Sequence, residues 1–406
     1  MKRSSIVSFG FFLASRPQQV LAWQFPRPPS MPPHAPQQHR QKPMFGESSL
    51  HGLEDDDIDI VTGSQFHGLR TYANLPYVNC LSEAGAEKGQ KYDIAILGAP
   101  FDTASPPGFC FSSTVTGRPG ARYGPGGIRI GSQRIQVDNY NVYTGRSTLQ
   151  SWATVVDCGD VPLTWLDNNV ALKQLDKAHR VVSGRKAANC THSITPRIVT
   201  LGGDHTTTLS ALRSTHERWG PVSVIHFDSH IDTWDPAALG GGISDYAGLN
   251  HGTFLHIAHE EHLILNTSIH AGIRAPLIRA KGDLRNDLRC GFAMVKAREL
   301  DQIGAEGVIR RIKDRVGGSR VYISVDIDVL DPAFAPGTAE PGGWSTRELL
   351  TILDGLQGLH VVGADVVEVS PIYDNPGETT VLAAAEVALS LVELMVENPV
   401  KSLADA

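Results

Sequence analysis

Short apolar runs that alternate with helical patterns constrain the fold of this 406-residue chain more than any other feature. Strands that read as continuous apolar runs are buried on both faces, which is typical of a parallel sheet covered by helices on each side. The sequence therefore predicts a three-layer α/β/α domain around a central, mainly parallel sheet of about eight strands. The expected strands are Asp93–Leu97, Ala153–Asp157, Arg197–Leu201, Val222–Phe227, Ser268–Ile273, Ala293–Val295, Val321–Val325 and Val361–Val369. The expected helices are Leu172–Ala188, Glu299–Arg315, Ser345–Gly358 and Thr379–Glu397.

Residues 1–62 are expected to lie outside this domain. Two basic residues precede an apolar run at 6–14, as in a secretory signal, but Arg16 and Pro17 interrupt the pattern. The rest of the leader is rich in Pro, Gln and His and then acidic, which indicates a disordered segment or a pro-segment. We expect a single folded domain over residues 63–406, in the secretory pathway if the signal is real and in the cytoplasm otherwise.

Composition argues against several classes of partner. The formal net charge of −7 gives no basic footprint for nucleic acid or anionic lipid, and no stretch reads as long enough to span a bilayer. We therefore expect no nucleic-acid or membrane partner, whereas a small cationic substrate is compatible with the charge. The five cysteines are odd in number and lack CxxC spacing, so isolated thiols are expected.

Ionisable side chains follow three of the expected strands. In such sheets, ligands bind at the carboxyl ends of the strands. Alternate side chains of an extended segment share one face, so the residues after each strand are expected to converge. These residues are His205 in LGGDH, Asp228, His230 and Asp232 in VIHFDSHIDTW, and Asp326 and Asp328 in SVDIDVLDP.

The charges of this cluster require compensation. Four carboxylates at neighbouring strand ends repel one another unless cations lie among them. Any one of the three motifs alone is more simply explained by caps and loop hydrogen bonds, but their combination favours a metal site. Oxygen ligands with some imidazole suit a hard or borderline divalent ion such as manganese better than structural zinc.

Longer segments around these residues resemble, in order, the signatures of the ureohydrolase superfamily, which contains arginases and agmatinases. They are LGGDHTTTL, VIHFDSHIDTW, NHGTFLHIAHEE, SVDIDVLDPAFAPGTAEPGGWSTREL and VVEVSPIYD. The segment RPGARYGPGGIR also resembles the family's early loop. DPAFAPGT followed by PGGW points to agmatinases, and SHIDTW with HGTFLHIAHEE resembles the agmatinase-like branch found in fungi. The resemblance extends from about Phe66 to Glu397 and implies an arginase-like fold and a homo-oligomer.

The resemblance also implies a ligand set for two manganese ions per chain. Asp228 and Asp326 would bridge the two ions, His205 and Asp232 would complete one site, and His230 and Asp328 would complete the other. Metals of this kind lower the pKa of a bound water, which supplies a nucleophile near neutral pH. Asp232 would also orient that nucleophile.

Two further residues gain roles from the same resemblance. His251 in NHGTF matches the family histidine that passes a proton to the leaving amine. Glu368 in VVEVSP matches the carboxylate that binds the guanidinium nitrogens of the substrate. By itself, His251 would read as a structural loop histidine and Glu368 as a salt-bridge partner. Asp204 and Asp331 are expected to orient metal ligands.

The resemblance implies hydrolysis of the guanidino group of agmatine to putrescine and urea. The alternatives are another guanidino substrate, such as guanidinobutyrate or, less in keeping with the motifs, arginine, and a catalytically silent metal-binding protein of the same fold. No basic residue occurs between 235 and 250, which favours the cationic tail of agmatine. Ser105–Thr114 departs from the family pattern, as a loop at the pocket mouth or a translated intron, and Arg118 or Arg122 could reverse the charge preference.

Overall fold

The computed structural model describes residues 68–82, 90–102, 119–240 and 246–405. Ser105–Thr114 and Arg118 lie outside the described residues. Residues 1–67 also lie outside the described residues, so the division of the chain at residue 62 stays a prediction.

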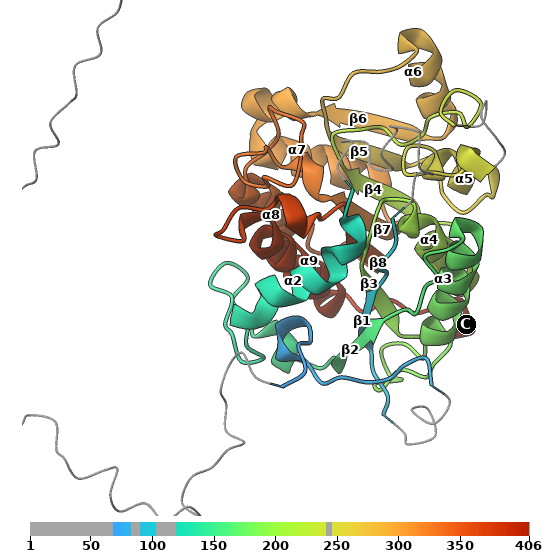
Figure 1. Ribbon diagram of the computed structural model, residues 1–406. Helices are drawn as coiled ribbons and strands as arrows, with labels where there is room; N and C mark the ends of the chain where they lie inside the picture. The colour runs from blue at the N-terminus through green and yellow to red at the C-terminus, as the bar shows by residue number, and fades with distance from the viewer. Residues whose placement is uncertain (1–67, 83–89, 103–118, 241–245, 406) are drawn as a thin grey trace, which may run out of the picture. The chain divides into compact units, whose positions relative to one another are not determined.

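Among the described residues, eight strands form one parallel sheet in the order β2-β1-β3-β8-β7-β4-β5-β6 (Figure 1). The strands are β1 (Ile94–Gly98), β2 (Val155–Asp160), β3 (Arg197–Leu201), β4 (Ser223–Phe227), β5 (Ser268–Ile273), β6 (Phe292–Lys296), β7 (Arg320–Asp326) and β8 (His360–Val367). Each predicted strand is present within a few residues of its expected bounds. The parallel sheet and its strand number are confirmed.

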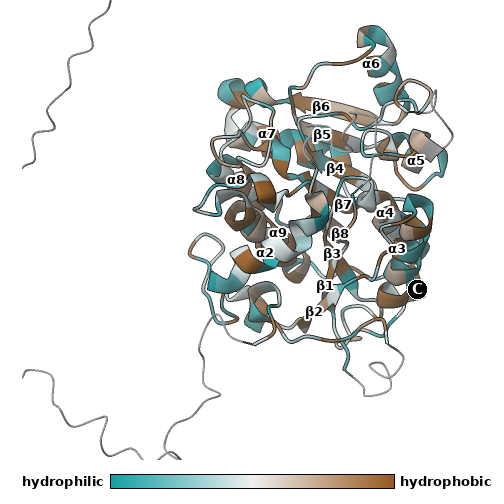
Figure 2. Cartoon of the chain, in the orientation of Figure 1, coloured by the Kyte–Doolittle hydropathy of each residue, from teal (hydrophilic) through white to brown (hydrophobic). Residues whose placement is uncertain are grey.

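Helices cover both faces of the sheet, which makes three layers (Figure 1). One side carries α2 (Gly124–Gly131), α7 (Leu300–Val316), α8 (Thr346–Gly355) and α9 (Thr379–Glu397). The other side carries α3 (Asn168–Ser183), α4 (Thr207–Trp219) and α5 (Phe254–Glu260), and α6 (Ala280–Arg289) lies at the β6 edge. The central strands are mostly apolar, with a few buried polar residues such as His226 and Asp365, while outward helix faces are more polar (Figure 2).

The four predicted helices are present as α3, α7, α8 and α9. The sequence did not predict α4, whose run of threonines reads more readily as a strand than as a helix. Leu209 and Leu212 of α4 are buried and the helix packs against α3, so tertiary burial overrides the weak local propensity. This helix matters for the site because it begins two residues after His205.

The expectation that no stretch is long enough to span a bilayer is wrong for α9 by length and composition. This helix has 19 residues and a mean hydropathy of 1.8. However, 72% of its apolar window is buried inside the protein, where Leu391 and Val387 join the core cluster under β8. A central helix packed on a sheet passes the same composition test as a membrane span, and burial supports the first explanation.

The expectation of isolated thiols is also wrong, because Cys80 and Cys158 form a disulfide across 78 residues. The backbone N–H of Val78 donates to the carbonyl of Asp157 at 2.9 Å, which holds the segment before β1 alongside β2. The two cysteine Cα atoms thereby lie 5.4 Å apart, within the usual range for a disulfide. Of the other described cysteines, Cys290 is buried and Cys190 exposed, and both are free.

A buried ion pair anchors α2 to the edge of the sheet and offers a test of the fold. Arg129 is 6% exposed and donates through Nε and Nη2 to the carboxylate of Asp157, at 2.8 and 2.9 Å, and through Nη1 to Asp160. Arg129→Met should lower the free energy of unfolding by about 3–5 kcal/mol, since it leaves the Asp157 carboxylate buried without its cation. Urea denaturation followed by circular dichroism measures this change. A loss below about 1 kcal/mol, as for an exposed pair, would contradict this account.

Candidate metal centre

The predicted metal ligands lie at the carboxyl ends of three central strands, and the predicted substrate-binding Glu368 lies at the end of a fourth. His205 follows β3, Asp228 directly follows β4, and Asp326 is the last residue of β7. Glu368 directly follows β8, which lies between β3 and β7. The strand order therefore brings together residues that are up to 163 positions apart in the chain.

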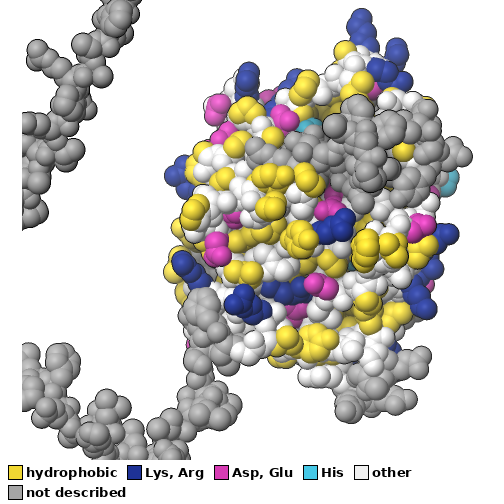
Figure 3. All heavy atoms as spheres, viewed as in Figure 1, with side chains coloured by type: hydrophobic (Ala, Val, Ile, Leu, Met, Phe, Trp, Pro, Cys, Tyr) yellow, Lys and Arg dark blue, Asp and Glu magenta, His cyan; other side chains and the backbone are white. Residues whose placement is uncertain are grey.

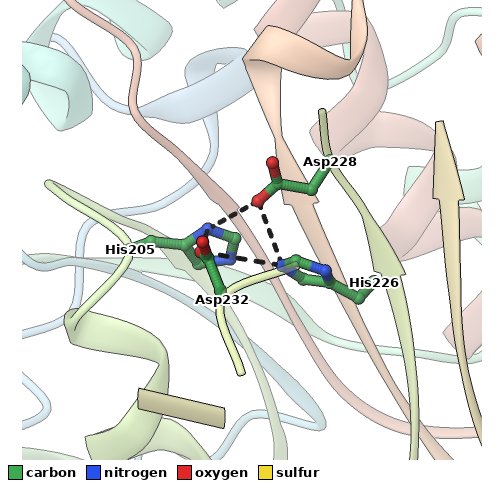
Figure 4. A group of neighbouring side chains, drawn as sticks. All are labelled: His205, His226, Asp228 and Asp232. Atoms are coloured by element: carbon green, nitrogen blue, oxygen red, sulfur yellow. Dashed lines mark ion pairs between the residues drawn. The ribbon is translucent and has the colours of Figure 1, made fainter. Parts of the chain in front are cut away.

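Three carboxylates surround one imidazole nitrogen. His205 Nδ1 lies 3.1 Å from Asp228 Oδ2, 3.1 Å from Asp232 Oδ2 and 3.3 Å from Asp326 Oδ2. All four side chains are at most 2% exposed. Figure 4 shows His205, Asp228 and Asp232 directed toward one point, together with His226.

Hydrogen bonds behind His205 determine which of its nitrogens faces this cluster. Ser324 Oγ donates to Asp365 Oδ1 at 2.7 Å, so it accepts the hydrogen of His205 Nε2 at 2.8 Å. Asp365 also accepts from Tyr322 and Thr208, which fixes its carboxylate in place. His205 Nδ1 is therefore the nitrogen that faces the carboxylates, and once deprotonated it offers its lone pair to a metal ion.

A second cluster shares one carboxylate with the first. His230 Nδ1 lies 3.0 Å from Asp328 Oδ2 and 3.3 Å from Asp228 Oδ1. Ser229 donates to Asp328 through both its backbone N–H and its hydroxyl, which fixes that side chain. Asp228 thus directs one oxygen to each cluster, as a residue that bridges two cations must.

The sequence analysis missed His226 as a member of the first cluster. Its Nε2 lies 3.1 Å from Asp228 Oδ2 and 4.0 Å from Asp232 Oδ2 (Figure 4). Burial lowers the pKa of His226 to about 4, so its ring is neutral near pH 7. The signal was present in the sequence, since the alternation that relates Asp228 to His230 extends back to His226 within β4.

Backbone geometry at the site departs from the extended segment that the alternation assumed. The residues after β4 form bends, and Asp232 has a φ of +49°. Glu368 likewise has a φ of +59°. The left-handed region costs about 1–3 kcal/mol for such residues and is found preferentially at functional sites. Asp228, His230 and Asp232 therefore converge as predicted, but a strained loop brings Asp232 into the cluster rather than strand alternation.

Close backbone approach at one glycine positions His205. A Cβ atom on Gly203 would lie 1.7 Å from the carbonyl oxygen of Phe101, so another residue would force this turn apart. The N–H of Asp204 donates to the same carbonyl at 2.8 Å. The N–H of His205 then donates to Glu368 Oε1 at 2.9 Å, which ties the loops after β3 and β8 together.

Glu368 lies beside His205, whereas the turn that carries His251 lies beside the Asp232 loop. Burial and the nearby Asp326 and Asp204 raise the pKa of Glu368 well above its usual value. His251 is half-buried in the turn before α5. The N–H of Trp234 donates to the carbonyl of Gly252 at 3.0 Å and that of Leu255 to the carbonyl of Asp232 at 3.2 Å, so the His251 turn lies against the Asp232 loop.

The residues of the centre fit a pair of cations. Within the described part of the chain, both carboxylate oxygens of Asp232, Asp228 Oδ2, His205 Nδ1 and His226 Nε2 are buried without a hydrogen-bond partner. Burial and then Asp228 raise the pKa of Asp232 to about 6. Although burial opposes it, the surrounding carboxylates raise the pKa of His205 well above its usual value. Each of these features reflects excess negative charge that divalent cations would neutralise.

Comparison with known proteins agrees with this geometry. A model of the arginase family matches residues 92–393. The chain is 48% identical to putative agmatinase 1 of Schizosaccharomyces pombe over 375 residues, which cover 88% of this chain and 91% of that one. It is 34% identical to a guanidinobutyrase of Pseudomonas aeruginosa over 323 residues, covering 79% and 90% of the two chains. The solved structure of proclavaminate amidino hydrolase from Streptomyces clavuligerus superposes with a TM-score of 0.68 at 31% identity, covering 83% of this chain and all of that one.

A parallel α/β fold with an acidic His/Asp centre at the strand ends, together with these matches, defines a metal-dependent hydrolase of guanidino compounds. The chain belongs to the arginase family and is an agmatinase-like ureohydrolase.

Proposed function

We propose that this protein hydrolyses agmatine to putrescine and urea with two manganese ions per chain. The observation that carries the proposal is Asp228, whose two oxygens face two separate groups of candidate ligands. We assign His205 and Asp232 to one ion, His230 and Asp328 to the other, and Asp228 and Asp326 to both. This oxygen-rich ligand set favours manganese over zinc, because structural zinc sites are rich in sulfur ligands.

The proposed mechanism divides the reaction among the chain's own residues. When bound, the two cations supply a water of lowered pKa as the nucleophile. Asp232, whose carboxylate oxygens lack hydrogen-bond partners in the described part of the protein, accepts a hydrogen bond from that water and orients it. Glu368 binds the guanidinium nitrogens and holds the carbon in line for attack. His251 delivers a proton to the leaving amine, so the C–N bond breaks with putrescine neutral at that nitrogen.

The charges near the proposed position of the substrate's tail support agmatine. Arg122, one candidate for reversing the preference, donates through Nε to Asp102 at 2.5 Å and pairs with the same carboxylate through Nη2. Its charge is therefore already balanced. Asp235 lies in the stretch that follows the Asp232 loop, and its carboxylate is 3.8 Å from the guanidinium of Arg279. Both side chains are partly exposed, so water weakens this ion pair and leaves Asp235 able to attract a cationic tail.

The test of the substrate is kcat/KM for agmatine, guanidinobutyrate and arginine at the same manganese loading. We expect agmatine to be preferred over guanidinobutyrate by at least about tenfold, which is about 1.4 kcal/mol of transition-state discrimination. A tenfold preference for guanidinobutyrate would replace the substrate and keep the chemistry. Release of no urea from any of the three by the manganese-loaded protein would instead support the catalytically silent alternative.

We propose a homo-oligomer, which size-exclusion chromatography with light scattering would measure. On the face that Figure 3 draws, Lys and Arg side chains are interspersed with Asp and Glu. Such a mixed surface is compatible with a small guanidino compound as the main partner.

A further inference from the structure

The disulfide between Cys80 and Cys158 indicates the kind of compartment in which this chain folds. Both cysteines are 3% exposed, and the bond joins the segment before β1 to β2 across 78 residues. Structural disulfides form and persist in oxidising compartments such as the secretory pathway, whereas cytosolic thiols are kept reduced. The folded domain therefore favours the first of the two localisations that the N-terminal residues left open.

A chain that enters the secretory pathway of a eukaryotic cell can receive glycans on asparagine in Asn-x-Ser/Thr triplets. This sequence has two such triplets, Asn189-Cys190-Thr191 and Asn266-Thr267-Ser268. Because a short motif of this kind also arises by chance, its structural context has to decide whether it is used. The two triplets differ in that context.

The first triplet forms an exposed turn between α3 and β3. The N–H of His192 donates to the carbonyl of Asn189 at 3.1 Å, which closes the turn, and Cys190 and Thr191 are both exposed. Thr191 Oγ1 donates to Asn189 Oδ1 at 2.6 Å, so the hydroxyl of the triplet lies beside the acceptor amide. Within the described residues, Asn189 Nδ2 donates no hydrogen bond. Both groups that define the motif are therefore presented at the surface.

The second triplet continues into β5 and buries the hydroxyl that defines it. Asn266 is exposed, but Ser268 is the first residue of β5 and is 0% exposed. Ser268 Oγ donates to the carbonyl of Leu265 at 2.8 Å and accepts from the N–H of Val224 at 3.0 Å. Its hydroxyl is withdrawn from recognition once β5 has formed, which makes this triplet an internal comparison for the first.

A glycan on Asn189 would leave the candidate metal centre open. The triplet precedes β3, whereas His205 follows the carboxyl end of that strand. The five residues of β3, at about 3.3 Å each, separate its two ends by about 16 Å. The loop with the triplet is also anchored, because Asp405 accepts from the N–H of Ile194 at 2.9 Å and from Ser193 Oγ at 3.1 Å. The glycan would thus extend from an anchored loop at the end of the sheet opposite to the site.

We propose that Asn189 is an N-glycosylation site and that the protein folds in the secretory pathway. The donor is an oligosaccharide linked to a lipid diphosphate. Asn189 Nδ2 forms a bond to the anomeric carbon of the first sugar and gives up one proton. The bond between that carbon and the diphosphate oxygen breaks, and the lipid diphosphate leaves with the electron pair. The inference adds a modification site to the proposed function and does not rest on it.

The experiment is expression of the full-length chain, with its own N-terminal residues, in a eukaryotic cell. Peptide mass spectrometry is performed before and after a glycosidase that releases N-linked glycans and converts the acceptor to aspartate. We expect a glycan on Asn189 in a larger fraction of chains than on Asn266, with the Cys80–Cys158 disulfide intact in the same molecules. Asn189→Gln should remove this glycan and leave the rate of urea release unchanged.

Variants of the same turn separate recognition of the triplet from folding. Thr191→Ala should remove the glycan although Asn189 itself is unchanged, and Thr191→Ser, which restores a hydroxyl, should recover it. Cys190→Ser changes only the middle position and should keep the glycan. These substitutions lie in an exposed turn, so thermal melts of the deglycosylated variants should match that of the deglycosylated wild type.

The outcomes decide the site independently of the catalytic activity. An unmodified Asn189 in molecules that carry the disulfide overturns the proposal, and so does a glycan on Asn266 alone. A chain that stays in the cytosol with Cys80 and Cys158 reduced also overturns it. Failure of the glycosylated protein to release urea would instead contradict the proposed function and leave the modification site standing.

Discussion

Asp228→Asn is expected to lower kcat/KM for urea release by more than about a thousandfold, about 4 kcal/mol, while the fold survives. An amide lacks the negative charge that both clusters draw from this residue and offers only one oxygen to two ions. The substitution hardly changes the volume of the side chain. In the variant, the amide oxygen of Asn can accept the hydrogen bond that the His230 N–H donates to Asp228 Oδ1. Urea release and metal content, measured on the same preparation, check this result.

The control for this variant is Asp93→Asn, at the amino end of β1 and so at the opposite end of the strands from the site. Asp93 precedes β1, is 4% exposed and accepts from the N–H groups of Thr154 and Asn189 at 2.8 and 2.6 Å. Asp93 is nearly as buried as the site carboxylates. The Asp93→Asn variant should nevertheless keep kcat within about twofold of the wild-type value. Full activity of Asp228→Asn after exhaustive chelation would refute a dinuclear mechanism.

His251→Ala is expected to lower kcat by about 10- to 1,000-fold with a smaller change in KM, since a proton donor acts in the transition state. Added imidazole should restore part of the rate. Glu368→Gln should instead change both kcat and KM, because its contact with the guanidinium is present before and during the reaction. Steady-state kinetics on agmatine distinguish these patterns.

His256→Ala is the matched control on the neighbouring helix. His256 is half-buried in α5, where its Nδ1 lies 3.1 Å from Asn286 Nδ2. Its replacement should leave kcat unchanged within about twofold. An unchanged kcat in His251→Ala would show that another group passes the proton.

The sheet was predictable because its signal is local. A strand buried on both faces must be apolar at successive positions, so runs such as Val222–Phe227 identify themselves without knowledge of their neighbours. Helix α9 was predicted for the same reason, from a long apolar stretch. Helix α4 was missed because its stability comes from contacts with α3 and β8 that its own threonines do not encode.

The residues of the candidate centre were predictable as a set, but not their geometry. Carboxylates placed after apolar strands indicated that His205, Asp228 and Asp326 would meet, and they do. The path of the loop was not predictable, because alternation assumes extended backbone and Asp232 adopts a left-handed conformation. Only packing around a loop compensates for that strain, and packing is not a local property.

By itself, the sequence determined a parallel α/β fold and a set of candidate metal ligands, since both follow from residue type and short-range spacing. The ureohydrolase chemistry was implied by the resemblance of its motifs to that family. The tertiary structure decided which distant side chains meet. Cys80 pairs with Cys158 because β2 lies beside the segment before β1, and His270 reaches His226 because β5 lies beside β4. Strand order sets such pairings, and it depends on the free energy of the whole sheet rather than on the pattern of any single strand.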